Sequence, residues 1–267
     1  MLSVSGLLSR LDVLYDSGDR AAMEAFLEKH IAEAEAEQNE GALLALYNEQ
    51  QGFLRTGGRA AEAAAVTVKA LNLIEKLGLT DTKNHAATLI NAGTAHAMAG
   101  KPEEAIGYFQ KAEALLSSLG EGGYTLAALY NNISHALDAL HRPAEAAEYL
   151  EKALGIIETV PDAEDAAATT KAGLCAALMR LGRYEAAETY INSALAYYES
   201  EAGASDPHRC SAYCTAAELL YRKGQYAESV RLYEKALALI AAIYGVNDAY
   251  RITERNLNAA RKKAGVI

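Results

Sequence analysis

Residues 130–154 read YNNISHALDALHRPAEAAEYLEKAL, a stretch with the pattern of two helices joined by a tight turn. From Tyr130 onward, apolar or small residues recur with the spacing i, i+3, i+4, i+7, which places them on one helix face. Pro143 fits the first turn of the second helix, where its missing N–H would have no intrahelical partner. Small residues at Ala146 and Ala153 allow the two helices to approach closely. The stretch therefore predicts an antiparallel helix pair.

The turn of this stretch recurs along the chain at nearly constant spacing. The five turns start 41 or 42 residues apart, at Gly58, Gly100, His141, Gly182 and Gly224. A small residue stands five positions after each turn start and an alanine twelve positions after it. These residues are Ala63, Ala105, Ala146, Ala187 and Ser229, and then Ala70, Ala112, Ala153, Ala194 and Ala236. A sixth, degenerate copy begins at Gly18, so the chain is predicted to be an internal repeat of helix pairs.

The two clearest copies are GRYEAAETYINSAL at residues 182–195 and GQYAESVRLYEKAL at residues 224–237, and both resemble the tetratricopeptide repeat. The common form of that repeat has about 34 residues. The units here are longer by roughly one helical turn on each helix. This longer form resembles the repeats of kinesin light chain and of several bacterial regulators. The resemblance implies an all-α, right-handed solenoid of stacked antiparallel helix pairs.

The repeat spacing predicts one solenoid domain over residues 1–267, because stacked repeats share a continuous core. A degenerate first repeat at 1–40 is followed by repeats at 41–80, 81–122, 123–162, 163–205 and 206–246, and by a C-terminal capping helix at 247–267. The breaks between repeats offer Thr80 or Asp81, Asp162 and Asp206 as N-caps of the next helix. No break is long enough to serve as an interdomain linker.

Composition narrows the class of protein further. The chain has 51% hydrophobic residues, enough for a continuous core, and a net charge of −10, which argues against direct binding to nucleic acid. Three cysteines, an odd number on predicted helices, do not suggest a secreted disulfide framework. Neither a signal peptide nor an apolar run of about 20 residues is evident. We therefore expect a cytoplasmic protein with no membrane partner, whose oligomeric state the sequence leaves open.

The resemblance also points to a binding surface, because the first helix of each pair lines the concave side of such repeats. Carried over residue by residue, the inner residues are Asn48, Asn91, Asn131, Asn132, His135, Asp138, Arg180, Tyr221, Arg222 and Asn256. Asparagine costs roughly half a kcal/mol against alanine inside a helix, but its amide offers both a donor and an acceptor. In the family, asparagines at this phase bind the backbone of an extended peptide. Alternatively, these amides bond to neighbouring helices or face water.

The pattern departs from the family in the fourth long repeat. Lys171, Ala172 and Gly173 stand where the family pattern leads us to expect an aromatic residue and asparagines, so the groove there is either bare or open for a bulky side chain. A tight clamp for an acidic chain end is not expected, because the basic inner residues are scattered. These basic residues are Arg55, Arg180, Arg222, Arg255 and Lys262. The carboxylates Glu49, Asp138 and Glu218 favour mixed or basic ligands.

The sequence offers little for catalysis or metal binding. His135, Asp138 and His141 form a run of possible ligands, but their spacing drifts around the helix. Cys210 and Cys214 supply only two ligands where a structural zinc needs four. No nucleophile–base pattern or phosphate-binding glycine loop stands out. We expect no catalytic site, no metal and no cofactor, and we expect His96 to be a core residue.

These observations favour a non-catalytic protein–protein interaction module, an adaptor or scaffold that binds a peptide segment of a partner protein in its concave groove. The alternative is a ligand- or peptide-responsive bacterial regulator. Such regulators usually add a DNA-binding or effector-binding domain, for which few residues remain beyond the repeats. An enzyme is the least favoured reading.

Overall fold

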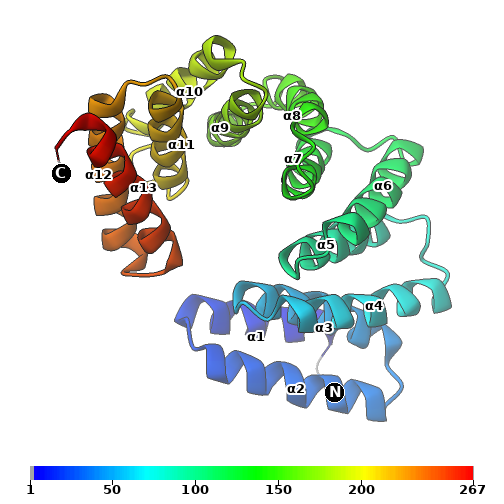
Figure 1. Cartoon of the computed structure of the whole chain (residues 1–267). Helices are drawn as coiled ribbons and strands as arrows, with labels where there is room; N and C mark the ends of the chain where they lie inside the picture. Colours follow the sequence, from blue (N-terminus) through cyan, green and yellow to red (C-terminus); the bar gives the residue numbers. More distant parts are fainter. Residues whose placement is uncertain (1–2, 267) are drawn as a thin grey trace. The chain divides into compact units, whose positions relative to one another are not determined.

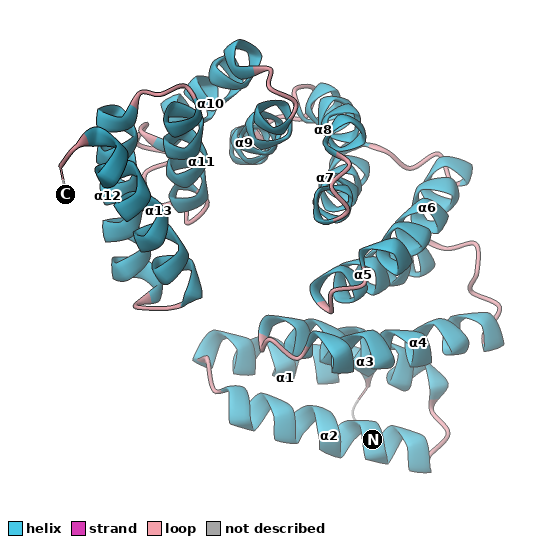
Figure 2. Ribbon diagram, in the orientation of Figure 1, coloured by secondary structure: helices cyan, strands magenta, loops and turns pink. Residues whose placement is uncertain are grey.

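The computed structural model describes residues 3–266, and over this range the chain forms thirteen α-helices and no β-strand (Figures 1 and 2). Consecutive helices form antiparallel pairs, so the predicted all-α helical-repeat class is confirmed. The chain divides into two compact units, Met1–Gly122 and Gly123–Ile267, and we describe each by itself. The stacking of all repeats into one continuous domain stays a prediction.

The helix boundaries follow the repeat closely. Unit 1 consists of α1 (Val4–Ser17), α2 (Arg20–Ala36), α3 (Glu40–Thr56), α4 (Ala60–Lys76), α5 (Lys83–Met98) and α6 (Pro102–Ser118). Unit 2 consists of α7 (Gly123–Ala139), α8 (Pro143–Ile157), α9 (Glu164–Arg180), α10 (Tyr184–Tyr198), α11 (Arg209–Arg222), α12 (Tyr226–Tyr244) and α13 (Asp248–Ala264). The helix α13 packs on α12, and its role as a cap stays a prediction.

The turns inside the helix pairs share one backbone conformation. The first residue of each turn has a positive φ. Glycine adopts this conformation without a Cβ penalty, and four of the five turns have glycine at this position. The exception is His141, whose φ is 57°. After it, the N–H of Arg142 reaches back to the carbonyl of Leu137 at 2.9 Å, so the same C-terminal helix cap is closed without glycine.

The small residues that mark the repeat lie where the two helices of a pair cross. All ten residues at the fifth and twelfth positions after the turn starts are at most 2% exposed. An alanine at such a crossing brings the backbones together, and a larger side chain would force them apart. The alanine pattern is thus the sequence signature of close helix packing.

A second pair of positions shows that the core keeps a similar volume from repeat to repeat. The residues seven before and nine after each turn start are both buried, and a smaller residue at one is matched by a larger one at the other. The pairs are Gln51 and Thr67, Gly93 and Phe109, Ser134 and Leu150, Cys175 and Ile191, and Ala217 and Tyr233. In the tightest pair, a Cβ added to Gly93 would clash with the Phe109 ring.

The structure corrects the predicted N-caps. α5 is capped by Thr82, whose Oγ1 accepts a hydrogen bond from the His85 N–H at 3.2 Å, and not by Thr80 or Asp81. Asp162 is also not a cap; it has a left-handed φ of 55°, and α9 begins two residues later. Asp206 accepts the N–H of His208 before α11 starts. Each of these loops is one or two residues longer than its sequence pattern indicates.

Candidate functional site

Unit 2 contains a groove of about 320 Å³ on its first helices, α7, α9 and α11. The residues that line it are Asn131, Ser134, His135 and Asp138 of α7, Ala146 and Leu150 of α8, Thr169, Ala172, Gly173, Ala176 and Ala177 of α9, Tyr198 of α10, and His208, Ser211 and Thr215 at α11. Three of the predicted binding residues, Asn131, His135 and Asp138, are therefore brought together here. The groove combines small apolar residues with hydroxyl, amide and imidazole groups.

The floor of the groove is formed by the small residues of α9. A Cβ on Gly173 would lie 3.3 Å from a methyl carbon of Leu150, so the glycine lets α9 approach α8 closely. The long side chain of Lys171 reaches away toward α10, where its Nζ lies 3.2 Å from the Ser193 hydroxyl. Because no long side chain of α9 covers Ala172 and Ala176, a hollow remains between α7 and α11.

Asn131 binds the next first helix as well as lining the groove. Its Nδ2 donates to the Ala127 carbonyl and to the Thr170 hydroxyl, both at 3.1 Å. The Thr170 hydroxyl also lies 2.8 Å from the Ala166 carbonyl and 3.2 Å from the Asn131 Oδ1. Since a hydroxyl has one hydrogen, a bond to Ala166 leaves the Asn131 Oδ1 with acceptor capacity for a ligand.

The same connection recurs in unit 1. The Thr88 hydroxyl lies 3.2 Å from the Asn48 Oδ1, again between successive first helices. At the equivalent position near the C-terminus, the Cys214 Sγ lies 3.5 Å from the Thr253 hydroxyl. For Asn48 and Asn131, the amide bonds to a neighbouring helix that the sequence left as an alternative are therefore present in the structure.

The second asparagine phase is different. Asn91, Asn132 and Asn256 are half-buried, and their side chains form no hydrogen bond with another residue between 3 and 266. Asn132 follows the groove residue Asn131 on α7, whereas Asn91 lies on α5 of unit 1 and Asn256 on α13. The amides of this phase keep both donors and acceptors free for water or a ligand.

Charges around the groove are largely balanced. Asp138 forms an ion pair with Arg180, which joins the C-terminal ends of α7 and α9. Desolvation lowers the pKa of His135, whose outer edge stays exposed, so its ring is neutral at neutral pH. The buried Tyr198 hydroxyl lies 3.1 Å from Thr169, and burial raises the pKa of Tyr198 to about 12. The groove thus offers neutral donors and acceptors at pH 7.

The remaining predicted residues lie outside this groove. The Tyr221 ring packs against Tyr226 with centroids 5.3 Å apart, and the Arg222 Nε donates to Glu218 at 2.7 Å. Sequence reasoning also missed several lining residues. Tyr198 escaped because the inner-face rule considers only the first helix of each pair, and His208 escaped because it precedes the first residue of α11. The hydroxyl residues Thr169 and Ser211 share one repeat phase, which the inner-face rule does not include.

Several other features bear on chemistry. Over residues 3–266, no three histidine, cysteine, aspartate or glutamate side chains gather closely enough to hold a metal ion. Burial raises the pKa of Cys175 to about 12 and also raises the pKa of Cys210 and of Cys214, so these thiols are poor nucleophiles at neutral pH. None of the described helices is long and apolar enough to span a bilayer.

Comparison with protein families gives a consistent result. A family model described as the tetratricopeptide repeat matches residues 52–118 and 164–242. A second model with the same description matches residues 126–160, which include most of α7 and α8. No curated protein matches the chain by sequence.

Several solved structures are similar to the chain. A putative kinesin light chain from Podosopora anserina, with nearly identical TPR-like repeats, has a TM-score of 0.61 at 17% identity, covering 75% of this chain and 96% of that one. BtubC (BKLC) from P. vanneervenii has a TM-score of 0.63 at 24% identity, covering 77% and 84%. NprR, the quorum sensor from B. thuringiensis, in complex with its cognate peptide NprX has a TM-score of 0.66 at 15% identity, covering 100% and 82%. At these identities the likeness shows the fold.

Proposed function

The chain belongs to the tetratricopeptide repeat family, and on this premise we propose that it is a non-catalytic protein-interaction module. The proposed ligand is an extended segment of a partner protein, and the proposed site is the groove on α7, α9 and α11 of unit 2. The observation that carries the proposal is the hollow over Ala172, Gly173 and Ala176, flanked by polar groups that neighbouring helices do not fully use.

The geometry suits one protruding side chain of the ligand. The floor of the groove is apolar and has room for a bulky residue, whereas polar groups at the sides can pair with the peptide backbone. The Asn131 Oδ1 would accept a backbone N–H inside the groove. The free amide of Asn132, the next residue of α7, would bond to a backbone group of the peptide just outside the groove. The neutral imidazole of His135 adds a further donor or acceptor.

The fold neighbours are compatible with this role. NprR has been solved in complex with its cognate peptide NprX, which means that a protein with this fold accommodates a peptide. The present chain shares only 15% identity with NprR, so the residues that would bind a ligand here are argued from this chain alone.

The test blocks the hollow without touching the polar sides. Peptides would first be selected from a random display library on the whole protein, and the affinity of the strongest binder measured by calorimetry. Ala176→Phe places a ring in the groove, and we expect affinity to fall at least about tenfold, since the bulky residue of the ligand loses its place. Ala196→Phe is the matched control, because Ala196 is exposed on α10 and does not line the groove.

A second variant separates the two asparagine phases. Asn132→Ala should weaken the selected peptide by about three- to tenfold without loss of thermal stability, because its amide has no partner within the described part of the chain. Unchanged affinity in both Ala176→Phe and Asn132→Ala, with the fold intact by circular dichroism, would rule out this groove.

A further inference from the structure

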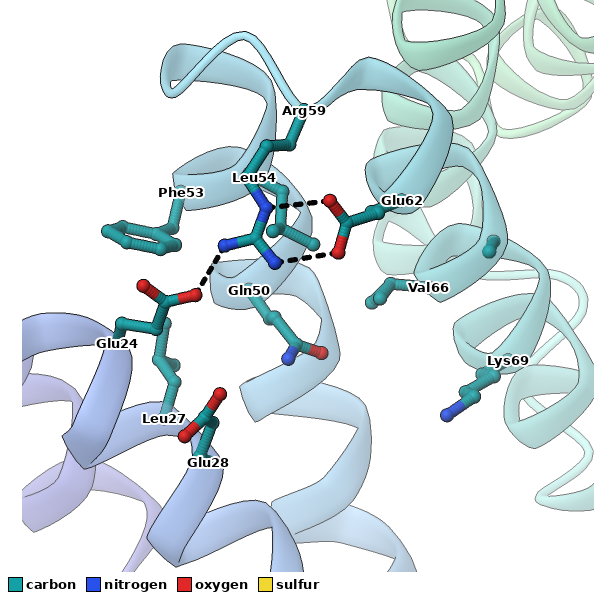
Figure 3. A pocket seen from close by; sticks show the side chains of 11 residues that line it. Glu24, Leu27, Glu28, Gln50, Phe53, Leu54, Arg59, Glu62, Val66 and Lys69 are labelled. Atoms are coloured by element: carbon teal, nitrogen blue, oxygen red, sulfur yellow. Dashed lines mark hydrogen bonds and ion pairs between the residues drawn. The ribbon is translucent and has the colours of Figure 1, made fainter.

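Unit 1 contains a second groove, of about 240 Å³, between α2, α3 and α4 (Figure 3). We propose that this groove binds a long cationic side chain, arginine or lysine, of a protein partner. The site is separate from the unit 2 groove, with which it shares no residue. It also uses another face of α3, because Gln50, Phe53 and Leu54 lie opposite the predicted inner residues Asn48 and Arg55 around the helix.

The base of the groove is apolar. Leu27 of α2, Phe53 and Leu54 of α3, and Val66 of α4 line it, and each is at most 9% exposed. Figure 3 shows Leu27 below Glu24, Phe53 and Leu54 beside Arg59, and Val66 beside Gln50. A surface of this kind covers the methylene stem of an arginine or lysine, which gains stability from burial while its charged end stays at the rim.

The rim is organised by Arg59, the residue before α4. Its Nε and Nη2 donate to the two carboxylate oxygens of Glu62, at 2.7 and 2.6 Å, and its Nη1 pairs with Glu24 of α2. Figure 3 shows the guanidinium between the two carboxylates. Arg59 thus joins α2 to α4 across the groove, and all its terminal nitrogens are occupied. Its single positive charge is already shared by two carboxylates.

One carboxylate of the rim lacks such a partner. Glu28 lies one turn after Glu24 on α2, and it pairs with no cation among residues 3–266. Lys69 lines the same groove, but its Nζ lies over the Tyr47 ring, 5.5 Å from the centroid. The Gln50 side chain projects toward the same hollow (Figure 3) and its amide oxygen is a further acceptor.

The charge of the groove selects the sign of its ligand. Three carboxylates and two cations line it, and Arg59 already serves two of the carboxylates. Lys69 pairs with no carboxylate among residues 3–266 and lies over Tyr47, so Glu28 is left without a cation and the lining carries one more negative than positive charge. An anionic side chain is therefore disfavoured, and a neutral one would leave Glu28 unpaired. A cation on a flexible apolar stem satisfies the floor, Glu28 and the Gln50 oxygen together.

The experiment uses a matched pair of peptides and the whole protein. The first is Ac-Ala-Leu-Arg-Leu-Ala-NH₂, and the second replaces arginine by citrulline, which keeps the shape of the side chain but carries no charge. Binding would be followed by two-dimensional ¹⁵N NMR. We expect the arginine peptide to shift the Gln50 side-chain amide and the backbone signals of α2 and α4 near the groove, with affinity about three- to fivefold above that of the citrulline peptide.

Glu28→Gln then tests the role of the carboxylate. We expect it to lower the affinity of the arginine peptide about three- to fivefold and to remove the preference over citrulline. Glu37→Gln is the control, because Glu37 lies at the end of the same helix outside the groove. Ala65→Trp should block both peptides, since Ala65 lines the groove and is exposed. Equal binding of the two peptides, shifts confined to other parts of the chain, or full affinity in Glu28→Gln would each overturn the proposal.

Discussion

The helix pairs α5–α6 of unit 1 and α9–α10 of unit 2 arise from the same repeat but fill their cores in different ways. In α5–α6 a glycine, Gly93, lies directly under the ring of Phe109. At the same two positions α9–α10 has Cys175 and Ile191, both buried. The total volume is similar although its division between the helices differs. The repeat therefore fixes the summed volume of the two side chains that meet at the helix crossing. Each pair divides that volume between its two helices differently.

A second difference lies at the buried position four residues before each turn. α5 places His96 there, 5% exposed, with its Nδ1 2.8 Å from the Ala92 carbonyl, whereas α9 places Leu178. A third difference lies on the face of the first helix that points away from its partner helix. There α9 has small residues, which form the floor of the unit 2 groove. What the two pairs share is a threonine, Thr88 or Thr170, that bonds to an asparagine of the preceding repeat.

Exchanging the crossing residues should give the largest effect. Gly93→Cys drives a side chain into the Phe109 ring and should cost about 2 kcal/mol, even after the gain in helix propensity. Phe109→Ile alone leaves a cavity and should cost about 1–2 kcal/mol. The double variant copies the pair of α9–α10 and should be more stable than the sum predicts by at least about 1 kcal/mol. Urea unfolding followed by circular dichroism measures all three, and strict additivity would contradict volume compensation.

Removing the shared threonine bond should cost less, and equally in both pairs. Thr170→Val keeps the shape but leaves an Asn131 amide hydrogen without its partner. Thr88→Val removes the hydroxyl that lies 3.2 Å from the Asn48 Oδ1 and 2.8 Å from the Asn84 carbonyl. Each should lower the free energy of unfolding by about 1 kcal/mol. Thr189→Val, at an exposed position of α10, is the control. An effect in one pair alone would show that the bond is not a common element of the repeat.

Replacing the buried histidine of α5 by the leucine that α9 uses should have a smaller effect. His96→Leu removes a satisfied polar group and substitutes an apolar side chain, so we expect unfolding free energy to change by less than about 1 kcal/mol, in the stabilising direction. The urea midpoint of this variant at pH 7 is the measurement. A loss of about 2 kcal/mol or more would mean that α5 depends on the imidazole and differs from α9 in kind.

The smallest effect concerns pH and the groove beside α9. His135 has a pKa below its ordinary value of 6.5 because desolvation by the groove around its partly exposed ring disfavours the charged form. The unfolded chain therefore binds this proton more readily, so stability should fall as pH drops from about 7 through the folded pKa. His135→Gln should flatten this part of the curve, by less than about 1 kcal/mol. His141→Asn, which suits the left-handed turn, should leave it unchanged.

Much of the fold could be predicted because the repeat is written in residue size and spacing. The alanines after each turn are buried where the two helices of a pair cross, so their spacing marks the crossings along this chain. The buried state of His96 also followed from its repeat phase. Predicted N-caps failed at Asp162 and Asp206 because loop residues adopt conformations that no periodic pattern records.

For the two grooves, too, some features could be predicted from the sequence and others only from the structure. Sequence by itself determined the all-helical repeat and its length, because residue size and spacing record where helices cross. The first-helix face on which Asn131, His135 and Asp138 lie came from the resemblance to the repeat family. Only the tertiary structure decided that Asn131 is bound to Thr170 while Asn132 is free, and that Tyr198 reaches the groove from a second helix. It also placed Glu24, Arg59 and Glu62 around one hollow in unit 1. Hydrogen-bond partners and the closure of a groove depend on distances between helices, which spacing along one chain does not encode.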